Sequence, residues 1–253
     1  KRIIDPLKVM GAKFDNISGM LPLKIIGKQL KNSNIVIEIP SAQIKSGLLL
    51  AAINTQGKCT LVEKNITRNH TENILESFGA EIDVKKNGNE TFISINGKRE
   101  LNSNNIDVPA DLSSSAFFIV AALINKNSKI SLKNINLNPT RDGIIKALKK
   151  MGANISIKNQ RILSGEIVAD LNVEYSELSG CELDAQMAKL MIDEYPILAI
   201  AAAFAKGPSL FRGLKELRVK ESDRLELIRL NLIRCGCECE ILNDDLLIKP
   251  SKK

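Results

Sequence analysis

The sequence contains no tryptophan, and phenylalanine and tyrosine bring its aromatic content to only 4%. Proteins that bind single-stranded nucleic acids stack the bases on aromatic side chains, so this composition argues against that class. No apolar run approaches the ~18 residues that a membrane span requires, and no charged segment with an apolar core and a cleavage site opens the chain. We therefore expect a soluble, cytoplasmic protein that binds neither nucleic acid nor membranes.

Histidine is nearly absent as well, since His70 is the only one. A zinc site needs pairs of cysteine or histidine ligands at short spacing, with partners elsewhere in the chain. Of the five cysteines, Cys235, Cys237 and Cys239 alternate with other residues, which predicts small buried thiols on one face of a strand. We therefore predict no metal site, and free thiols fit a reducing compartment.

The composition that remains is that of a folded protein. Its 253 residues are 44% hydrophobic, enough to bury one large core or two domains of ordinary size. The net charge of +7 suggests an anionic partner, but the lysines are spread along the chain, so most of this charge is interpreted as a solvated surface. The cations that can indicate a site for an anionic ligand are those at the starts of helices.

One short sequence returns four times, each time after an amphipathic helical stretch and before a strand-like segment. Its copies are Met10-Gly11-Ala12, Phe78-Gly79-Ala80, Met151-Gly152-Ala153 and the degenerate Cys235-Gly236-Cys237. Glycine readily adopts the left-handed conformation that ends a helix, and the small residue after it lets the next strand turn back. The copies therefore mark the ends of four similar helices.

A second element recurs in step with the first. Three segments are rich in Ala, Leu and Ile on almost every side, as buried helices are: 41–53, 111–124 and 193–205. Each is followed by a strand-like segment and then by a polar turn that contains Arg68, Arg141 or Arg224. The pattern predicts an α/β (α+β) fold of repeated βαβαββ units, at roughly 35–105, 106–175 and 176–253. Residues 1–34 would then end an earlier unit of a longer chain.

Ser41, Asp111 and Asp193 open the three buried helices, and such residues accept hydrogen bonds from the free amides of a helix start. For Ser41 and Asp111 taken alone, this capping role is the simpler interpretation. Asp193 is followed by Glu194 and Pro196, so two carboxylates stand where a helix dipole favours negative charge. Asp193 is therefore either an N-cap or the base for a bound hydroxyl group.

Two further segments gather polar groups at helix starts. Residues 218–224 hold five charges in seven positions, and Lys220 and Arg224 would point to one side if the helix began near Glu221. Such a cluster suits a phosphate or carboxylate, and its own carboxylates can pass protons to a bound anion. In 40–46, a hydroxyl, an amide and a lysine crowd a first turn, where they either hold a sugar-like ligand or cap the helix.

Five segments contain most of these groups. They are Ser41-Ala42-Gln43-Ile44-Lys45-Ser46, Thr67-Arg68-Asn69-His70-Thr71-Glu72, Ala110-Asp111-Leu112-Ser113-Ser114, Asp193-Glu194-Tyr195-Pro196 and Val219-Lys220-Glu221-Ser222-Asp223-Arg224. In this order they resemble the motifs of the EPSP synthase family of enolpyruvyl transferases, over nearly the whole chain. Ala110 departs from the family's usual Gly, and Thr67 from its usual Ser. The family's amino-terminal Lys-Ser segment, Gly-rich loop and Asp-His-Arg segment are absent, so part of the phosphoenolpyruvate site is not in this chain.

The resemblance implies two domains facing a central cleft that holds the substrates. Residues 1–107 would be the C-terminal part of the first domain and residues 108–253 the N-terminal part of the second. The implied reaction transfers the enolpyruvyl group of phosphoenolpyruvate to the 5-hydroxyl of shikimate-3-phosphate and releases phosphate. No metal or organic cofactor is implied, and we expect a monomer.

The resemblance also implies roles for single residues. Asp193 would take the hydroxyl proton, Glu221 is a candidate for protonating the methylene carbon, and Lys220 would hold substrate charge and assist proton transfer. The implied catalytic residues are Asp193, Lys220 and Glu221, and the implied substrate-binding residues are Ser41, Ala42, Gln43, Thr67, Arg68, Asp193, Lys220 and Arg224.

Two alternatives stay open. The enolpyruvyl transferase that acts on UDP-N-acetylglucosamine shares the architecture and chemistry, but the pairing of Ser-Ala-Gln with Lys-Glu-Ser-Asp-Arg argues against it. A truncated paralogue that binds anions without turnover would keep the same fold. Its gene would lack the flanking Lys-Ser, Gly-rich and Asp-His-Arg segments.

Overall fold

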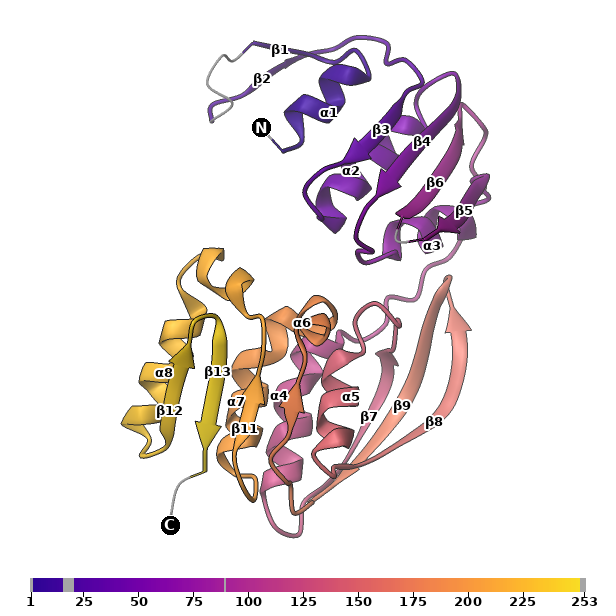
Figure 1. Ribbon diagram of the computed structural model, residues 1–253. Coiled ribbons are helices and arrows are strands. Elements are labelled where there is room, and N and C mark those ends of the chain that lie inside the picture. Colours follow the sequence, from indigo (N-terminus) through magenta and orange to yellow (C-terminus); the bar gives the residue numbers. More distant parts are fainter. Residues whose placement is uncertain (1, 16–20, 89, 251–253) are drawn as a thin grey trace. The chain divides into compact units, whose positions relative to one another are not determined.

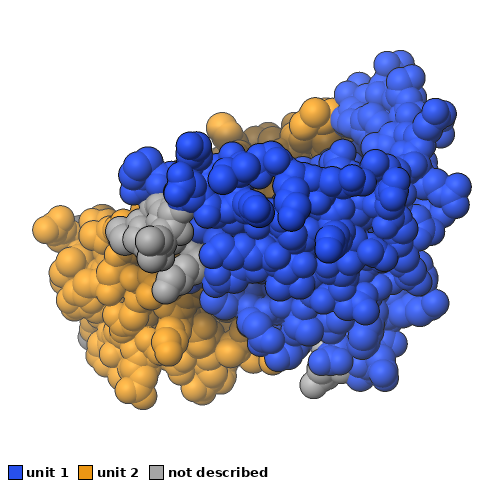
Figure 2. Space-filling view, turned by 90° about the horizontal axis from the view of Figure 1, so that it is seen from above, with its two compact units in different colours: residues 1–107 blue, residues 108–253 orange. Residues whose placement is uncertain are grey.

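Helices and strands alternate along the chain in the computed structural model, which describes residues 2–15, 21–88 and 90–250 (Figure 1). The chain separates into two compact units, each described by itself below. Unit 1 is residues 1–107 and unit 2 is residues 108–253 (Figure 2).

Unit 1 contains a small two-stranded sheet and a four-stranded sheet with its helices. Its elements are α1 (Ile4–Val9), β1 (Lys13–Asp15), β2 (Lys24–Ile26), β3 (Asn34–Ile37), α2 (Ala42–Ala52), β4 (Gly57–Glu63), α3 (His70–Ser77), β5 (Ile82–Asn87) and β6 (Glu90–Gly97). The larger sheet has the order β3-β4-β6-β5, in which only β3 and β4 are parallel. Apolar side chains of α2 pack on this sheet and form the core of the unit.

Unit 2 contains two sheets and the more extensive core. Its elements are α4 (Leu112–Ile124), β7 (Lys129–Asn136), α5 (Gly143–Lys150), β8 (Asn154–Leu163), β9 (Glu166–Glu174), β10 (Glu182–Leu183), α6 (Ala185–Met191), the 3-10 turn η1 (Ile192–Glu194), α7 (Tyr195–Ala203), β11 (Ser209–Phe211), the 3-10 turn η2 (Lys215–Val219), α8 (Arg224–Arg234), β12 (Glu238–Leu242) and β13 (Asp245–Lys249). The sheet orders are β7-β9-β8 and β10-β11-β13-β12. In the first sheet, a single parallel bridge from Ala110 to Ile135 stands in place of a first strand.

Three segments of the chain therefore share one topology. In each, the first two strands are parallel and are joined through an apolar helical segment, and the fourth strand lies between the second and the third. The second segment differs only in that its first strand is reduced to the bridge at Ala110. This arrangement confirms the α/β class and the repeated βαβαββ unit predicted from the sequence.

The repeated glycines end their helices as predicted. Gly11, Gly79, Gly152 and Gly236 follow α1, α3, α5 and α8, and all have φ between +84° and +91°. In the second copy, the amide of Gly79 donates to the carbonyl of Glu76 and the amide of Ala80 to that of Leu75, both at 2.9 Å. The other three copies make the same two bonds. Glycine is suited to this position because it has no Cβ to oppose a left-handed backbone.

The helix predicted over 193–205 differs from the observed one. Residues Ile192–Glu194 form η1, and α7 begins only at Tyr195, with Pro196 in its first turn. A separate helix, α6, precedes η1 and is capped by Asp184, whose carboxylate accepts bonds from two backbone amides at 2.8 and 3.2 Å. The apolar stretch alone did not reveal this break.

Two smaller predictions were also wrong. Helix α8 begins at Arg224, three residues after the predicted start, because Asp223 caps it by accepting from the amide of Glu226. Cys235, Cys237 and Cys239 do not share one face of a strand, since Cys235 is exposed at the end of α8 and, of these three, only Cys239 in β12 is buried.

The start of α7 is fixed by an aromatic pair. Tyr195 is fully buried and meets Phe211 of β11 edge to face, with ring centroids 5.6 Å apart. Aromatic pairs in this geometry contribute stabilisation beyond the apolar area that they bury. The pair therefore fixes α7, and with it the η1 turn just before it, against the sheet of β11.

One carboxylate secures two β-bulges in the first sheet of unit 2. Register shifts occur in β7 between Leu132 and Ile135 and in β8 between Lys158 and Arg161. Asp170 of β9 accepts bonds from the side chain of Asn159 (2.9 Å), the amide of Asn134 (3.0 Å) and Lys133 Nζ (3.3 Å). The Asn159 bond, then the Asn134 amide and Lys133, lower the pKa of Asp170 to about 2.

This shift predicts a pH-dependent contribution to stability. A carboxylate whose pKa falls on folding stabilises the protein above its unfolded pKa, about 3.9, and loses that contribution as pH falls towards the folded value. We expect Asp170→Asn to lower the melting temperature between pH 5 and 7, with the gap to wild type closing between about pH 4 and pH 2. Thermal melts across this range test it, and a gap that does not change with pH would contradict the assignment.

Candidate functional site

A charged group in unit 2 is centred on Asp193, in the η1 turn directly before α7. Lys220 Nζ lies 3.5 Å and Arg224 Nη1 3.4 Å from Asp193 Oδ1. The three side chains are 26–32% exposed, so they are partly shielded from water yet open to a ligand. The structure thus brings together three of the residues predicted from the sequence, although α8 begins later than predicted.

The segment that contains Lys220 is held at both ends. Arg218 donates through Nη1 to Asp223 at 3.1 Å and through Nε to Asp244 at 2.9 Å. Asp223 in turn caps α8, as described above. Arg218, one of the five charges of the sequence cluster, therefore fixes the turn that positions Lys220 and Arg224.

Glu221 extends from the same turn into solvent, with its side chain 77% exposed. Arg224 Nη2 donates to Glu221 Oε2 at 2.6 Å. The backbone amide of Glu221 itself and then Arg224 lower the pKa of this carboxyl group. A glutamate is ionised at neutral pH even at its ordinary pKa, so Glu221 is a carboxylate here with or without Arg224.

A second set of contacts reaches the buried residue next to Asp193. Glu194 is only 3% exposed and accepts a hydrogen bond from the hydroxyl of Ser113 in α4. Arg141 donates to the same hydroxyl at 2.5 Å and to Asp111 Oδ1 at 3.0 Å. The capping role predicted for Asp111 is confirmed, since its carboxylate accepts from the amide of Ser114 at 2.8 Å. These contacts join α4 and the turn before α5 to η1.

In unit 1, the predicted residues Ser41, Ala42 and Gln43 form the start of α2. Ser41 Oγ accepts from the amide of Ile44 at 3.4 Å, which confirms its capping role. A hydroxyl that accepts a bond keeps its own proton, so Ser41 can still donate to a ligand. Gln43 is exposed and Ala42 half-buried, so both border the surface at this helix start.

The predicted residues Thr67 and Arg68 lie in the loop between β4 and α3, where both are half-buried. This loop is tied to α2, because Lys45 Nζ donates to the carbonyl of Thr67 at 3.4 Å, and α3 after it is tied to α2 as well, since Ser46 Oγ lies 2.6 Å from Thr71 Oγ1. The structure thus joins the two predicted segments of unit 1.

The lysine in the first turns of α2 is not available to a ligand. Lys45 is 1% exposed, and its Nζ lies 3.1 Å from Glu63 Oε2 and 2.7 Å from Glu72 Oε1. Glu63 ends β4 and Glu72 lies in α3, so three elements meet at this buried ion cluster. Neither carboxylate was predicted from the sequence as a partner of Lys45.

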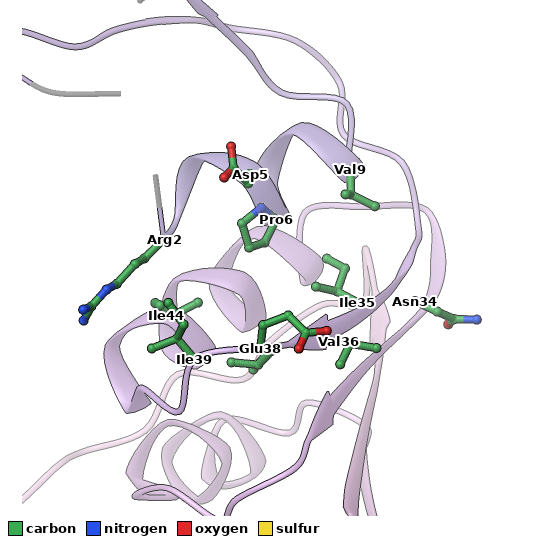
Figure 3. Close-up of a pocket in the computed structure, with 11 residues that line it drawn as sticks. Arg2, Asp5, Pro6, Val9, Asn34, Ile35, Val36, Glu38, Ile39 and Ile44 are labelled. Atoms are coloured by element: carbon green, nitrogen blue, oxygen red, sulfur yellow. The ribbon is translucent and has the colours of Figure 1, made fainter. Parts of the chain in front are cut away.

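An apolar cavity of unit 1 does not involve the predicted site residues. It has a volume of about 350 Å³ beside α1 and β3, and is lined mainly by apolar side chains such as Pro6, Val9 and Ile35, with the charged Arg2, Asp5 and Glu38 (Figure 3). None of the predicted substrate-binding residues lines it. The cavity is therefore not part of the predicted substrate-binding site.

Neither a metal cluster nor a membrane-spanning helix is found in the described part of the chain. Within residues 2–15, 21–88 and 90–250, no three His, Cys, Asp or Glu side chains are grouped as metal ligands would be. None of the helices in these ranges combines the length and the apolar composition that crossing a membrane requires.

Comparison with known proteins gives matches along the whole chain. The family model of EPSP synthase (3-phosphoshikimate 1-carboxyvinyltransferase) matches residues 1–253. A 3-phosphoshikimate 1-carboxyvinyltransferase from Paramagnetospirillum magneticum is 46% identical over 252 residues, which are 98% of this chain and 56% of that protein. The protein of that name from Vesicomyosocius okutanii is 43% identical over 249 residues, again 98% of this chain and 56% of the relative. The chain thus spans little more than half the length of these relatives.

Comparison with solved structures agrees with these sequence matches. An EPSP synthase structure from Acinetobacter baumannii superposes with a TM-score of 0.90 at 41% identity, over 100% of this chain and 57% of that one. The enolpyruvyl transferase NikO from Streptomyces tendae superposes with a TM-score of 0.63 at 16% identity, over 98% of this chain and 57% of that one, and shows the shared fold alone. The resemblance inferred from five short motifs is confirmed by these matches, and the chain belongs to the EPSP synthase family.

Proposed function

We propose that this chain takes part in the transfer of the enolpyruvyl group of phosphoenolpyruvate to the 5-hydroxyl of shikimate-3-phosphate, with release of phosphate. The observation that supports this most strongly is the contact of Asp193 with both Lys220 and Arg224. The group combines a carboxylate that can accept a proton with two cations that can hold anionic substrates. Both substrates of this reaction are phosphate esters, and one also has a carboxylate beside the reacting carbon.

In the proposed reaction, Asp193 accepts the proton of the 5-hydroxyl as its oxygen forms a bond to C2 of phosphoenolpyruvate. The methylene carbon gains a proton in the same addition, which gives a tetrahedral intermediate. Loss of phosphate and of one proton from the new methyl group then restores the double bond. A base must lie within hydrogen-bond reach of the proton that it removes, so Asp193 acts mainly through its position.

Glu221 is the proposed candidate for protonating the methylene carbon. An ionised carboxylate cannot donate a proton, and a glutamate at its ordinary pKa is ionised at neutral pH even without Arg224. If Arg224 turns to the carboxylate of phosphoenolpyruvate, one cause of the lowered pKa of Glu221 is removed. Proton donation by Glu221 also requires the bound substrates to desolvate this exposed side chain or to bring negative charge beside it.

The residues of unit 1 are proposed to bind shikimate-3-phosphate. Ser41 keeps a hydroxyl proton to donate, and Gln43 offers both donors and an acceptor at an exposed helix start. Ala42 lies between them, and Thr67 and Arg68 are proposed to face the phosphate group. Free amides at the start of a helix of this length favour an anion as well.

We further propose that residues 1–107 and 108–253 are parts of the two domains of an enolpyruvyl transferase. A cytoplasmic location is supported by the cysteines, because free thiols persist in a reducing compartment and all five are unpaired. A monomeric state is proposed as well, and light scattering on the complete gene product tests it.

Phosphate release distinguishes this function from its alternatives. The complete gene product should release phosphate from phosphoenolpyruvate when shikimate-3-phosphate is the acceptor and not when UDP-N-acetylglucosamine is. Release with the nucleotide sugar would support the related transferase. Binding of shikimate-3-phosphate without release would support a non-catalytic anion-binding paralogue.

Lys220→Ala is expected to weaken shikimate-3-phosphate binding and to slow turnover by roughly ten- to a hundredfold. The physical reason is the loss of one charge-assisted hydrogen bond to an anion, worth about 1.5–3 kcal/mol. Arg141→Ala should have a smaller effect, because Arg141 donates to Asp111 and Ser113, whereas Lys220 lies beside the proposed base Asp193. Calorimetry and steady-state kinetics on both variants test this, and equal effects would mean that the charged turns reflect the repeated fold rather than a site.

A further inference from the structure

The buried ion cluster of unit 1 uses every donor of its lysine. The ammonium group of Lys45 has three N–H bonds, and three oxygens lie within reach of it: Glu63 Oε2 at 3.1 Å, Glu72 Oε1 at 2.7 Å and the carbonyl of Thr67 at 3.4 Å. The side chains of Lys45, Glu63 and Glu72 are 1%, 2% and 7% exposed. The cluster is therefore a closed arrangement that bridges α2, β4 and α3.

The two carboxylates of the cluster differ in what else they contact. Glu63 Oε1 accepts the hydroxyl proton of Thr67 at 2.5 Å, so both oxygens of Glu63 have partners. Glu72 contacts Lys45 through Oε1, while its Oε2 makes no hydrogen bond to another described residue. Only Glu63 therefore connects the cluster to a side chain of the loop between β4 and α3.

This connection fixes the loop at a point that matters for the proposed site. Thr67 is held twice, through its hydroxyl by Glu63 and through its carbonyl by Lys45. A loop residue bonded at both its side chain and its backbone loses most of its freedom, and a site whose groups are already in place loses less entropy on binding. Arg68 follows Thr67 directly, so holding Thr67 also restricts the position of the Arg68 backbone.

We propose that Glu63 is a positioning residue for anion binding in unit 1, with Lys45 as its buried counter-ion. It holds the loop 64–69 so that Thr67 and Arg68 meet the phosphate group without a further ordering step. The proposal rests on the function proposed above for these two residues. Glu63 itself does not touch the substrate, because it is buried beneath the loop and both its oxygens are occupied.

A matched pair of variants tests the proposal. Glu63→Gln and Glu72→Gln each remove one buried carboxylate and each leave Lys45 with one acidic partner, so the charge of the cluster is the same in both. Only Glu63→Gln weakens the hold on Thr67. We expect it to raise the Kd of shikimate-3-phosphate about tenfold, the order of magnitude of the entropic cost of ordering one loop residue on binding, and to change kcat by less than about threefold. Glu72→Gln should leave both within about twofold of wild type.

A second measurement does not depend on the substrate. Hydrogen–deuterium exchange of the amides in 64–69, in the complete gene product without ligand, should be faster in Glu63→Gln by about an order of magnitude and unchanged in Glu72→Gln. Thr67→Val, which removes the hydroxyl at a half-buried position, should speed exchange in the same amides. With Thr67→Val present, Glu63→Gln should add little, because the two changes break one contact.

The outcomes separate this proposal from the function on which it rests. Equal loop exchange in Glu63→Gln and Glu72→Gln, or additive effects of Glu63→Gln and Thr67→Val, would overturn the role of Glu63. A wild-type protein that does not bind shikimate-3-phosphate would overturn the proposed function of unit 1, and the exchange comparison would still decide whether Glu63 holds the loop.

Discussion

Asp193→Asn is expected to lower kcat by roughly 10²–10⁴, the usual contribution of a general base, with the Kd of shikimate-3-phosphate within a few-fold of wild type. Asparagine has nearly the same size and can still accept the hydrogen bond from Arg224, but its amide cannot accept the hydroxyl proton. Substrate binding therefore survives while proton removal does not. Steady-state kinetics together with calorimetry separate the two quantities.

The structure helps to distinguish a catalytic role of Asp193 from a capping role. The residue before α7 is Glu194, which makes no side-chain cap, and Asp193 lies one position earlier in η1. Asp184 is a true cap in the same unit and provides a matched control. Asp184→Ala should reduce stability by about 0.5–2 kcal/mol and leave kcat unchanged. Near-normal kcat in Asp193→Asn would eliminate the catalytic role.

Lys45→Met is expected to have the largest effect on stability, a loss of about 3–5 kcal/mol in the free energy of unfolding. The methionine fills much of the space of the lysine stem but leaves Glu63 and Glu72, 2% and 7% exposed, without a counter-ion. Removing one partner from a buried ion cluster is costly because the remaining charges stay desolvated. Urea unfolding of wild type and variant measures the difference.

A compensating variant checks the cause. Adding Glu63→Gln and Glu72→Gln to Lys45→Met removes the buried charges altogether, and neutral groups in place of a buried ion cluster often restore stability. We expect the triple variant to recover most of the loss. A triple variant as unstable as Lys45→Met alone would show that the cluster acts through shape and not through charge.

The repeated topology could be predicted because it depends on local signals that recur. Gly11, Gly79 and Gly152 each end a helix with a positive φ that few other residues tolerate, and each stands in the same short sequence. The apolar stretches that became α2 and α4 were recognised by a similar local signal, but the prediction that they are buried on almost every side was wrong, since Leu50 of α2 and Phe117 and Phe118 of α4 are exposed.

Local signals were ambiguous where two helices follow each other closely. The segment from Ala185 to Ala203 is apolar with few breaks, and its division into α6, η1 and α7 is set by the Asp184 cap and by the packing of Tyr195 on Phe211. The second of these is a tertiary contact that no window of the sequence contains. The prediction therefore joined η1 to α7 and placed Asp193 at the start of that helix, where a cap was one of its two interpretations.

The sequence contains a signal for the buried ion cluster. Every second residue of β4, namely Cys59, Leu61 and Glu63, lies on its buried face. The alternation of side chains along a strand therefore places the carboxylate of Glu63 in the core. A buried carboxylate needs a cation, and Lys45 lies between the buried Ile44 and Leu48 of α2. The contact of Ser113 with Glu194 has no such signal in the sequence, because the two residues are 81 positions apart and neither is unusual for its position.

Running the reaction in heavy water probes the proposed chemistry itself, in which a proton is added to the methylene carbon and one is then lost as the enolpyruvyl group moves. The complete gene product is incubated with shikimate-3-phosphate and phosphoenolpyruvate in D₂O, and the vinyl protons of the product are followed by NMR. We predict deuterium in the methylene group of the product, because the methyl group of the intermediate contains one deuteron and two protons when it loses a hydrogen. A product whose methylene group contains only protium would be incompatible with this addition and elimination.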